Sequence, residues 1–149
     1  MAAVSEILTA QAGAYRFGER DCVRTLIEIY RRLAARPDER RLMLYFELAR
    51  GSEADALARL AAEGGPLRLY PRILGDHATV MSPGDAAPEP GDILFYDRPI
   101  RVGCHLFDAA PGAEAMAFLD DGMQALHWTP GGLLPVEQSD SWRALMRIA

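Results

Sequence analysis

The stretch GAYRFGERDCVRTLIEIYRRLAAR, residues 13–36, joins a glycine-bearing turn directly to a helical pattern. After the turn, apolar side chains recur at the spacing of one helix face: Cys22, Leu26, Ile29, Tyr30 and Leu33. Asp21 stands at the expected N-cap, and Pro37 predicts the end of the helix. We therefore expect a helix that begins at Cys22 and packs one stripe of its side chains into a core.

Cys22 would lie on the first turn of this helix, where a thiol has two possible roles. The amino end of a helix carries about half a positive charge and several free N–H groups, which favour the thiolate that attacks carbonyl carbon. A tight turn with Gly18 would let substrate backbone reach the sulfur. The alternative is that Cys22 is a small buried apolar side chain at the head of the stripe. Position alone leaves both roles open.

Helical patterns fill most of the first half of the chain. Residues 3–12 predict a short helix with one apolar side, formed by Val4, Ile7 and Leu8. DERRLMLYFELARG, residues 38–51, predicts a second helical stretch. In residues 52–65, Ser52 is a plausible N-cap and Asp55 follows three residues later, close to a capping box, so we expect a helix that ends at the Gly pair.

The second half of the chain has the pattern of short strands. Four apolar runs are bounded by turn residues: GDILFYD (91–97), RVGCHLFDA (101–109), EAMAFLD (114–120) and MQALHWT (123–129). Asp121–Gly122 predicts a tight hairpin turn between the last two. Residues 139–148 predict a terminal strand or a single helical turn.

Helices followed by an antiparallel sheet predict an α+β domain. We assign residues 1–149 to a single domain with a helical part (1–75), a linker (76–90) and an antiparallel sheet (91–149). The length of 149 residues is enough to bury a core.

Composition restricts the possible partners. The net charge of −5 provides no basic field for nucleic acid or an anionic membrane. Arginines gather at positions 31, 32, 36, 40 and 41, but Asp38 and Glu39 lie among them, so we interpret the cluster as a solvated helix end. No window approaches the ~18 apolar residues of a membrane span, and the opening residues do not resemble a secretory leader. We expect synthesis in a reducing cytoplasm.

The sequence predicts neither a metal site nor a cofactor site. Two cysteines and three histidines lack the close spacing of zinc ligands. No glycine-rich phosphate loop follows a predicted strand.

Three motifs, taken in order, resemble the NlpC-type cysteine peptidases. YRFGERDC (15–22) is similar to their nucleophile segment, EPGDILFYD (89–97) to their Pro–Gly–Asp strand and RVGCHLF (101–107) to their HVGIY strand. Residues 53–75 also resemble the helical insert of small uncharacterised phage and prophage proteins in that superfamily. The resemblance covers about residues 13–136 and implies a papain-like fold, in which the helix that bears cysteine packs on an antiparallel sheet.

The resemblance also implies roles for individual residues. It makes Cys22 the nucleophile, with a histidine base on the second strand and a polar residue on the next. Setting RVGC against HVGI puts Arg101 at the position of the base, and an arginine stays protonated and cannot accept the thiol proton. Two alternatives remain for the base: His105, on the same strand face as Arg101, and His127, on the neighbouring strand.

Two functions follow from the resemblance. The first is a cysteine peptidase or amidase that acts on peptidoglycan stem peptides in a phage or prophage. The second is a catalytically inactive structural or adaptor component of a phage tail tip. In both, the expected partners are other tail or tail-tip proteins, without nucleic acid, and the protein enters a phage-like particle, the virion tail, after synthesis.

Overall fold

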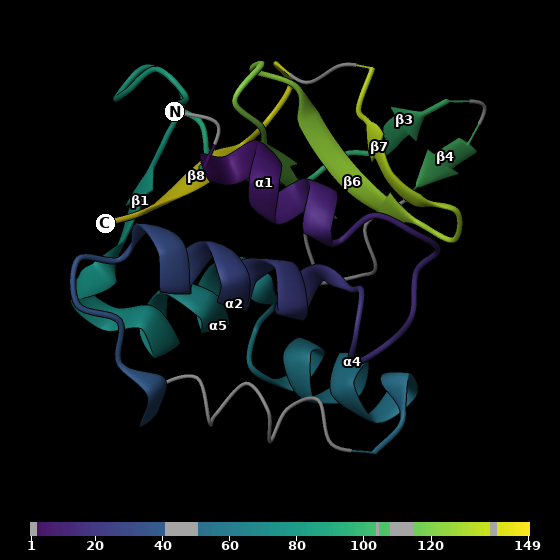
Figure 1. Ribbon diagram of the computed structural model, residues 1–149, viewed down its shortest axis with the longest axis horizontal. Coiled ribbons are helices and arrows are strands. Elements are labelled where there is room, and N and C mark those ends of the chain that lie inside the picture. The colour runs from purple at the N-terminus through teal and green to yellow at the C-terminus, as the bar shows by residue number, and fades with distance from the viewer. Residues whose placement is uncertain (1–2, 41–50, 104, 108–114, 138–139) are drawn as a thin grey trace.

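The computed structural model describes residues 3–40, 51–103, 105–107, 115–137 and 140–149. Helices lie along one face of an antiparallel sheet, and a separate two-stranded hairpin accompanies the other face (Figure 1). The expected α+β class is confirmed.

The helices come first in the chain: α1 (Ala3–Ala10), α2 (Cys22–Leu33), α4 (Glu53–Ala62), α5 (Pro66–Leu74) and the short 3₁₀ turn η1 (Gly75–His77). The six-stranded sheet has the order β1-β8-β2-β5-β6-β7, and its bonded neighbours are antiparallel. Its strands are β1 (Ala78–Met81), β2 (Ile93–Tyr96), β5 (Ala115–Leu119), β6 (Ala125–Thr129), β7 (Gly132–Pro135) and β8 (Ala144–Ile148). The hairpin consists of β3 (Ile100–Val102) and β4 (His105–Phe107).

The start of α2 is fixed by Asp21. Its carboxylate accepts the N–H of Gly18 at 2.6 Å and the N–H of Arg24 at 2.8 Å, which caps the helix as expected. At the other end, the Ala34 N–H bonds to the Tyr30 carbonyl and the chain leaves the helix before Pro37. Three members of the predicted stripe are fully buried: Leu26, Ile29 and Tyr30.

The other predicted helix boundaries are confirmed where the structure describes them. In α4, Ser52 and Asp55 form the reciprocal bonds of a capping box, at 3.2 and 3.4 Å. In α1, Val4 and Leu8 are buried. Most of the helical stretch expected at 38–51 lies outside the described residues.

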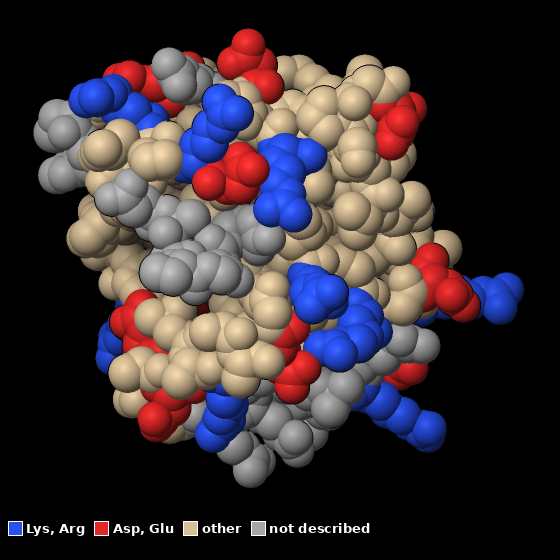
Figure 2. Space-filling view, turned by 180° about the vertical axis from the view of Figure 1, so that it is seen from behind, with Lys and Arg blue, Asp and Glu red and all other residues tan. Residues whose placement is uncertain are grey.

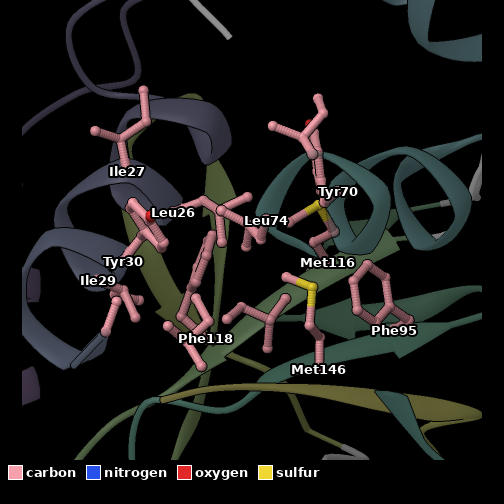
Figure 3. Packing of buried hydrophobic residues seen from close by; sticks show 14 of the residues in the cluster. Leu26, Ile27, Ile29, Tyr30, Tyr70, Leu74, Phe95, Met116, Phe118 and Met146 are labelled. Carbon is pink, nitrogen blue, oxygen red and sulfur yellow. The ribbon is translucent and has the colours of Figure 1, made fainter. Parts of the chain in front are cut away.

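The sheet separates two apolar clusters. The larger, the helix-side cluster, packs α1, α2 and α5 on side chains that include Phe95, Met116, Phe118 and Met146 (Figure 3). The smaller, the hairpin-side cluster, packs β3 and β4 against side chains that include Leu94, Tyr96 and Leu145. Because successive side chains of a strand point to opposite faces, a strand between two clusters is apolar at every position. This explains why all of β2 is buried.

Gly91, just before β2, allows the sheet to approach the helices closely. It adopts a φ of +91°, and a Cβ built on it would collide with the side chain of Leu33. Only glycine combines this conformation with the contact between the start of β2 and α2.

The run RVGCHLFDA does not form the single strand that we expected. It folds back at Gly103, which has a φ of +61°, and places Val102 opposite His105 in a hairpin. Arg101 lies opposite Leu106 instead of four residues along one strand from His105. The prediction was wrong because a lone glycine inside an apolar run was not recognised as a turn.

Three elements were missed and two others confirmed. Residues 66–74 had no predicted helix of their own but form α5, the linker expected at 76–90 contains β1, and β7 was not expected. The hairpin turn between β5 and β6 is confirmed, with the Met123 N–H bonded to the Asp120 carbonyl at 3.1 Å. Of the two alternatives for residues 139–148, the strand is correct.

Candidate functional site

The candidate site is the first turn of α2, where Cys22 lies. Its side chain is partly buried and packs against the helix-side cluster. The Tyr15 hydroxyl donates a hydrogen bond to Glu53 Oε1 at 2.7 Å. Since Glu53 is the first residue of α4, this bond holds α4 beside the amino end of α2 (Figure 1).

This environment disfavours the thiolate. Burial raises the pKa of the Cys22 thiol to about 12, and the negative charges of Asp21 and Glu53 act in the same direction. A backbone hydrogen bond lowers the pKa but is outweighed. The expectation that the helix end would favour the thiolate is therefore wrong, since the Asp21 carboxylate accepts the N–H of Arg24 in the first turn and brings its own charge. At neutral pH the sulfur is protonated.

An indole from the sheet anchors the first turn of α2. Trp128 Nε1–H donates to Thr25 Oγ1 at 3.0 Å, and that hydroxyl donates to the Asp21 carbonyl at 2.9 Å. The ring of Trp128 also meets Tyr15 edge-to-face, with centroids 6.0 Å apart. Trp128 and Tyr15 therefore form an aromatic contact beside the turn that carries Cys22.

His127 points to the other face of the sheet. Its neighbours Leu126 and Trp128 pack in the helix-side cluster, whereas Ala125, two residues away on β6, packs in the hairpin-side cluster. The imidazole meets Phe107 of β4 edge-to-face, with centroids 5.0 Å apart. Strand alternation thus puts the sheet between His127 and Cys22.

The hydrogen bonding of His127 is also occupied by the backbone. Its Nδ1 lies 2.8 Å from the Met116 carbonyl oxygen, and because a carbonyl only accepts, Nδ1 is the nitrogen that carries hydrogen. Burial lowers the pKa of His127, and the bond to Met116 opposes this shift without reversing it. The imidazole is thus neutral at pH 7 and remote from the thiol.

His105 belongs by its backbone to the hairpin on the second face, where it pairs with Val102. The side chain of His105 lies outside the described part of the structure. Arg101 is exposed, with its guanidinium 3.7 Å from Glu137. The strands bonded to β2 are β5 and β8, not β3, so the side chains that face the helices beside β2 are Met116, Phe118 and Met146. The register that set Arg101 at the base position is not found in the sheet.

His77 likewise makes contacts away from the site. Its Nδ1 lies 3.1 Å from the Ala149 carbonyl oxygen, and its ring meets Tyr30 with centroids 5.6 Å apart. Of the two histidines named for catalysis, His127 lies across the sheet from Cys22, and the backbone of His105 lies in the hairpin. The sequence analysis missed Trp128: strand alternation puts it on the same face as Leu126 but does not show that this face meets α2.

A cleft of about 260 Å³ lies elsewhere, between α1, the β5–β6 turn and β7. Its lining includes Ser5, Thr9, Asp120 and Leu133 but neither Cys22 nor His127. Within the described ranges, no group of three or more His, Cys, Asp or Glu side chains is placed to hold a metal ion. No helix in the described part of the chain combines the length and apolar character needed to cross a membrane.

Several surface charges of the described residues form ion pairs. Arg31 lies 3.0 Å from Glu28 and 3.2 Å from Glu39, and Arg32 lies 2.9 Å from Glu6. On the face seen in Figure 2, acidic and basic side chains lie next to one another with broad uncharged areas between them. This agrees with the interpretation of the arginine cluster as a solvated helix end.

No known family model, curated protein or solved structure matches this chain.

Proposed function

We propose that this chain is a catalytically inactive NlpC-like protein that serves as a structural or adaptor component of a phage tail tip. The order of the Asp–Cys, Gly–Asp and Val–Gly motifs supports the kinship. So does the packing of α2, which begins at Cys22, on an antiparallel sheet that contains the Gly–Asp strand β2. A fold can be retained after its chemistry is lost.

The observation that carries the proposal is the environment of Cys22. A cysteine nucleophile needs a neighbouring base or a lowered pKa. Here burial raises the pKa of the thiol to about 12. The side chain that the sheet directs at the first turn of α2 is Trp128, bonded to Thr25, and an indole N–H cannot accept a proton.

Alkylation of the two cysteines tests this proposal. The protein is treated with iodoacetamide at pH 7.5, and peptide mapping follows Cys22 and Cys104 separately, with the urea-unfolded chain as reference. We expect Cys22 to react more slowly in the folded than in the unfolded chain, at a rate unchanged by His105→Ala or His127→Ala. Fast alkylation of Cys22 that falls in either variant would overturn the proposal.

A cysteine hydrolase is the second candidate, and one observation favours it. Cys22 keeps part of its surface exposed at a helix amino end, after a turn in which Gly18 has a φ of +85°. The test is release of stem-peptide fragments from peptidoglycan, with Cys22→Ala as the control. Release that this variant abolishes would support the hydrolase, whereas no release from either protein agrees with the adaptor.

The adaptor role has its own assay. We expect Cys22→Ala to copurify with tail components as the unmodified chain does, because the role needs the fold and not the sulfur. Loss of copurification in a correctly folded Cys22→Ala variant would count against a purely structural role.

A further inference from the structure

The two edges of the six-stranded sheet differ in how they are finished. Beyond β7 the chain pairs with the hairpin, through a bridge between Val102 and Val136 and a 2.9 Å bond from the Glu137 N–H to the Arg101 carbonyl. β7 also ends in Pro135, a residue that blocks further pairing. At the opposite edge, β1 pairs with β8 on one side, and no other described strand pairs with its outer side (Figure 1).

The register with β8 identifies which backbone groups of β1 point outward. The Ala149 N–H bonds to the His77 carbonyl at 3.0 Å, so hydrogen-bonded pairs fall at every second position from His77. Thr79 and Met81 therefore bond to β8, while Val80 directs both its N–H and its C=O away from the sheet. Within the described chain, neither of these Val80 groups makes a hydrogen bond, and the Val80 side chain is 45% exposed.

The side chains of β1 leave this edge open. The strand reads Ala-Thr-Val-Met and contains no charged residue and no proline, the usual devices that protect an edge. Ser82 comes next at the outward-facing parity, and its N–H bonds to the Asp85 carboxylate at 3.2 Å. That bond places a negative charge at the next outward-facing position of the edge, two residues beyond Val80.

This charge argues for one kind of occupant. An exposed Asp76 precedes β1 and Asp85 follows it, so both ends of the edge are acidic. A second copy of this chain, paired symmetrically about Val80, would bring Asp85 of one molecule toward Asp76 of the other, with like charges opposed. An extended segment with basic ends would instead complement both.

We propose that the outer edge of β1 binds an extended, β-branched segment of a partner protein as a seventh strand, with a basic residue of that segment meeting Asp85. This inference names the contact surface of the proposed adaptor and rests on that function for the identity of the partner. The binding itself is tested on the isolated protein, so its failure would leave the adaptor role standing.

The probe is the acetylated, amidated peptide Lys-Thr-Val-Thr-Val-Thr-Lys, titrated into the ¹⁵N-labelled protein. We expect chemical-shift changes centred on the Val80 amide. A matched peptide with Glu at both ends should bind about two- to fivefold more weakly, the range expected for one exposed ion pair. Shifts centred on β7, or no saturable shifts, would overturn the proposal.

Two variants test the edge by different means. Val80→Pro removes an N–H that points away from the sheet and should abolish binding, while Val80→Thr should retain it. If Val80→Pro fails to fold, Asp85→Asn tests the proposal instead. This variant keeps an acceptor for the Ser82 N–H, and it should bind the Lys peptide and the Glu peptide equally well. The protein without peptide is also tested for self-association. If it self-associates, and the Val80→Thr variant does so too while the Val80→Pro variant does not, the occupant of the edge is a second copy and the proposal is overturned.

Discussion

The two faces of the sheet differ in what they hold, although the same strands build both. On the helix side, large side chains such as Phe118 and Trp128 fill the space under α2 and α5. Along the same strands, the positions between them point to the hairpin side and include small residues such as Ala117 of β5 and Ala125 of β6. His127 belongs to this second face, one residue from Trp128. A shift of one position along β6 therefore decides whether an indole or an imidazole faces the first turn of α2.

The largest expected effect tests which face carries the stability. Phe118→Ala removes a fully buried ring from the centre of the helix-side cluster and should lower the free energy of unfolding by about 3–5 kcal/mol. Phe107→Ala removes a partly buried ring from the hairpin-side cluster and should lower it by only about 1–2 kcal/mol. Guanidinium unfolding curves measure both. Equal losses would mean that the hairpin is as much a part of the core as the helices.

The next prediction exchanges the side chain that faces α2. Trp128→His should lower the free energy of unfolding by about 2–4 kcal/mol, because it leaves a cavity and removes the bond to Thr25. It also puts an imidazole on the helix face, where its positive form would lower the pKa of Cys22. We expect faster alkylation of Cys22 at pH 7.5.

His127→Ala is the matched control for that exchange and should leave the alkylation rate unchanged, since its imidazole lies across the sheet. If the control changed the rate as much as Trp128→His, the two faces would not be insulated from each other.

Local signals in the sequence were sufficient for much of the fold. The Asp21 cap, the capping box at Ser52 and the Asp121–Gly122 turn each depend on a few adjacent residues, and all three are present. The elements that were missed depend on distant partners. β1 is a four-residue strand in a Pro- and Gly-rich connection, and it forms because β8, at the other end of the chain, pairs with it.

The candidate site was harder to predict than the fold. That Cys22 begins a helix follows from its neighbours, but its pKa depends on burial and on Glu53 of α4. That His127 and Trp128 face opposite ways follows from strand alternation. Which of them faces α2 depends on how β6 is placed in the sheet, and local sequence does not encode this.

The raised pKa of the thiol predicts a loss of stability at alkaline pH. The folded chain keeps the Cys22 proton up to about pH 12, whereas the unfolded thiol has a pKa of 9.0. Above pH 9 the unfolded state therefore binds fewer protons, and stability falls as pH rises. At pH 10 the loss of unfolding free energy that Cys22 causes should be at most about 1.4 kcal/mol. It should be smaller than this limit because the side chain is partly exposed.

Cys22→Ala isolates this contribution. Its unfolding free energy should decline less steeply between pH 9 and 10.5 than that of the unmodified chain, as followed by urea unfolding. Burial also raises the pKa values of Tyr15, Tyr70 and Tyr96, so a residual decline remains in the variant. Identical slopes in the two proteins would contradict the raised pKa of the thiol.

The smallest expected effect comes from the imidazole on the hairpin face. Burial lowers the pKa of His127 below its ordinary value of 6.5, so on acidification the unfolded chain takes up this proton before the folded chain does. Stability should therefore fall as pH drops below 6.5. The NMR titration of the His127 ring measures the folded pKa directly, and His127→Asn should remove its share of the acid sensitivity. A midpoint above 6.5 would mean that an acidic group reaches this ring, and the hairpin face would then be a charged site and not an apolar one.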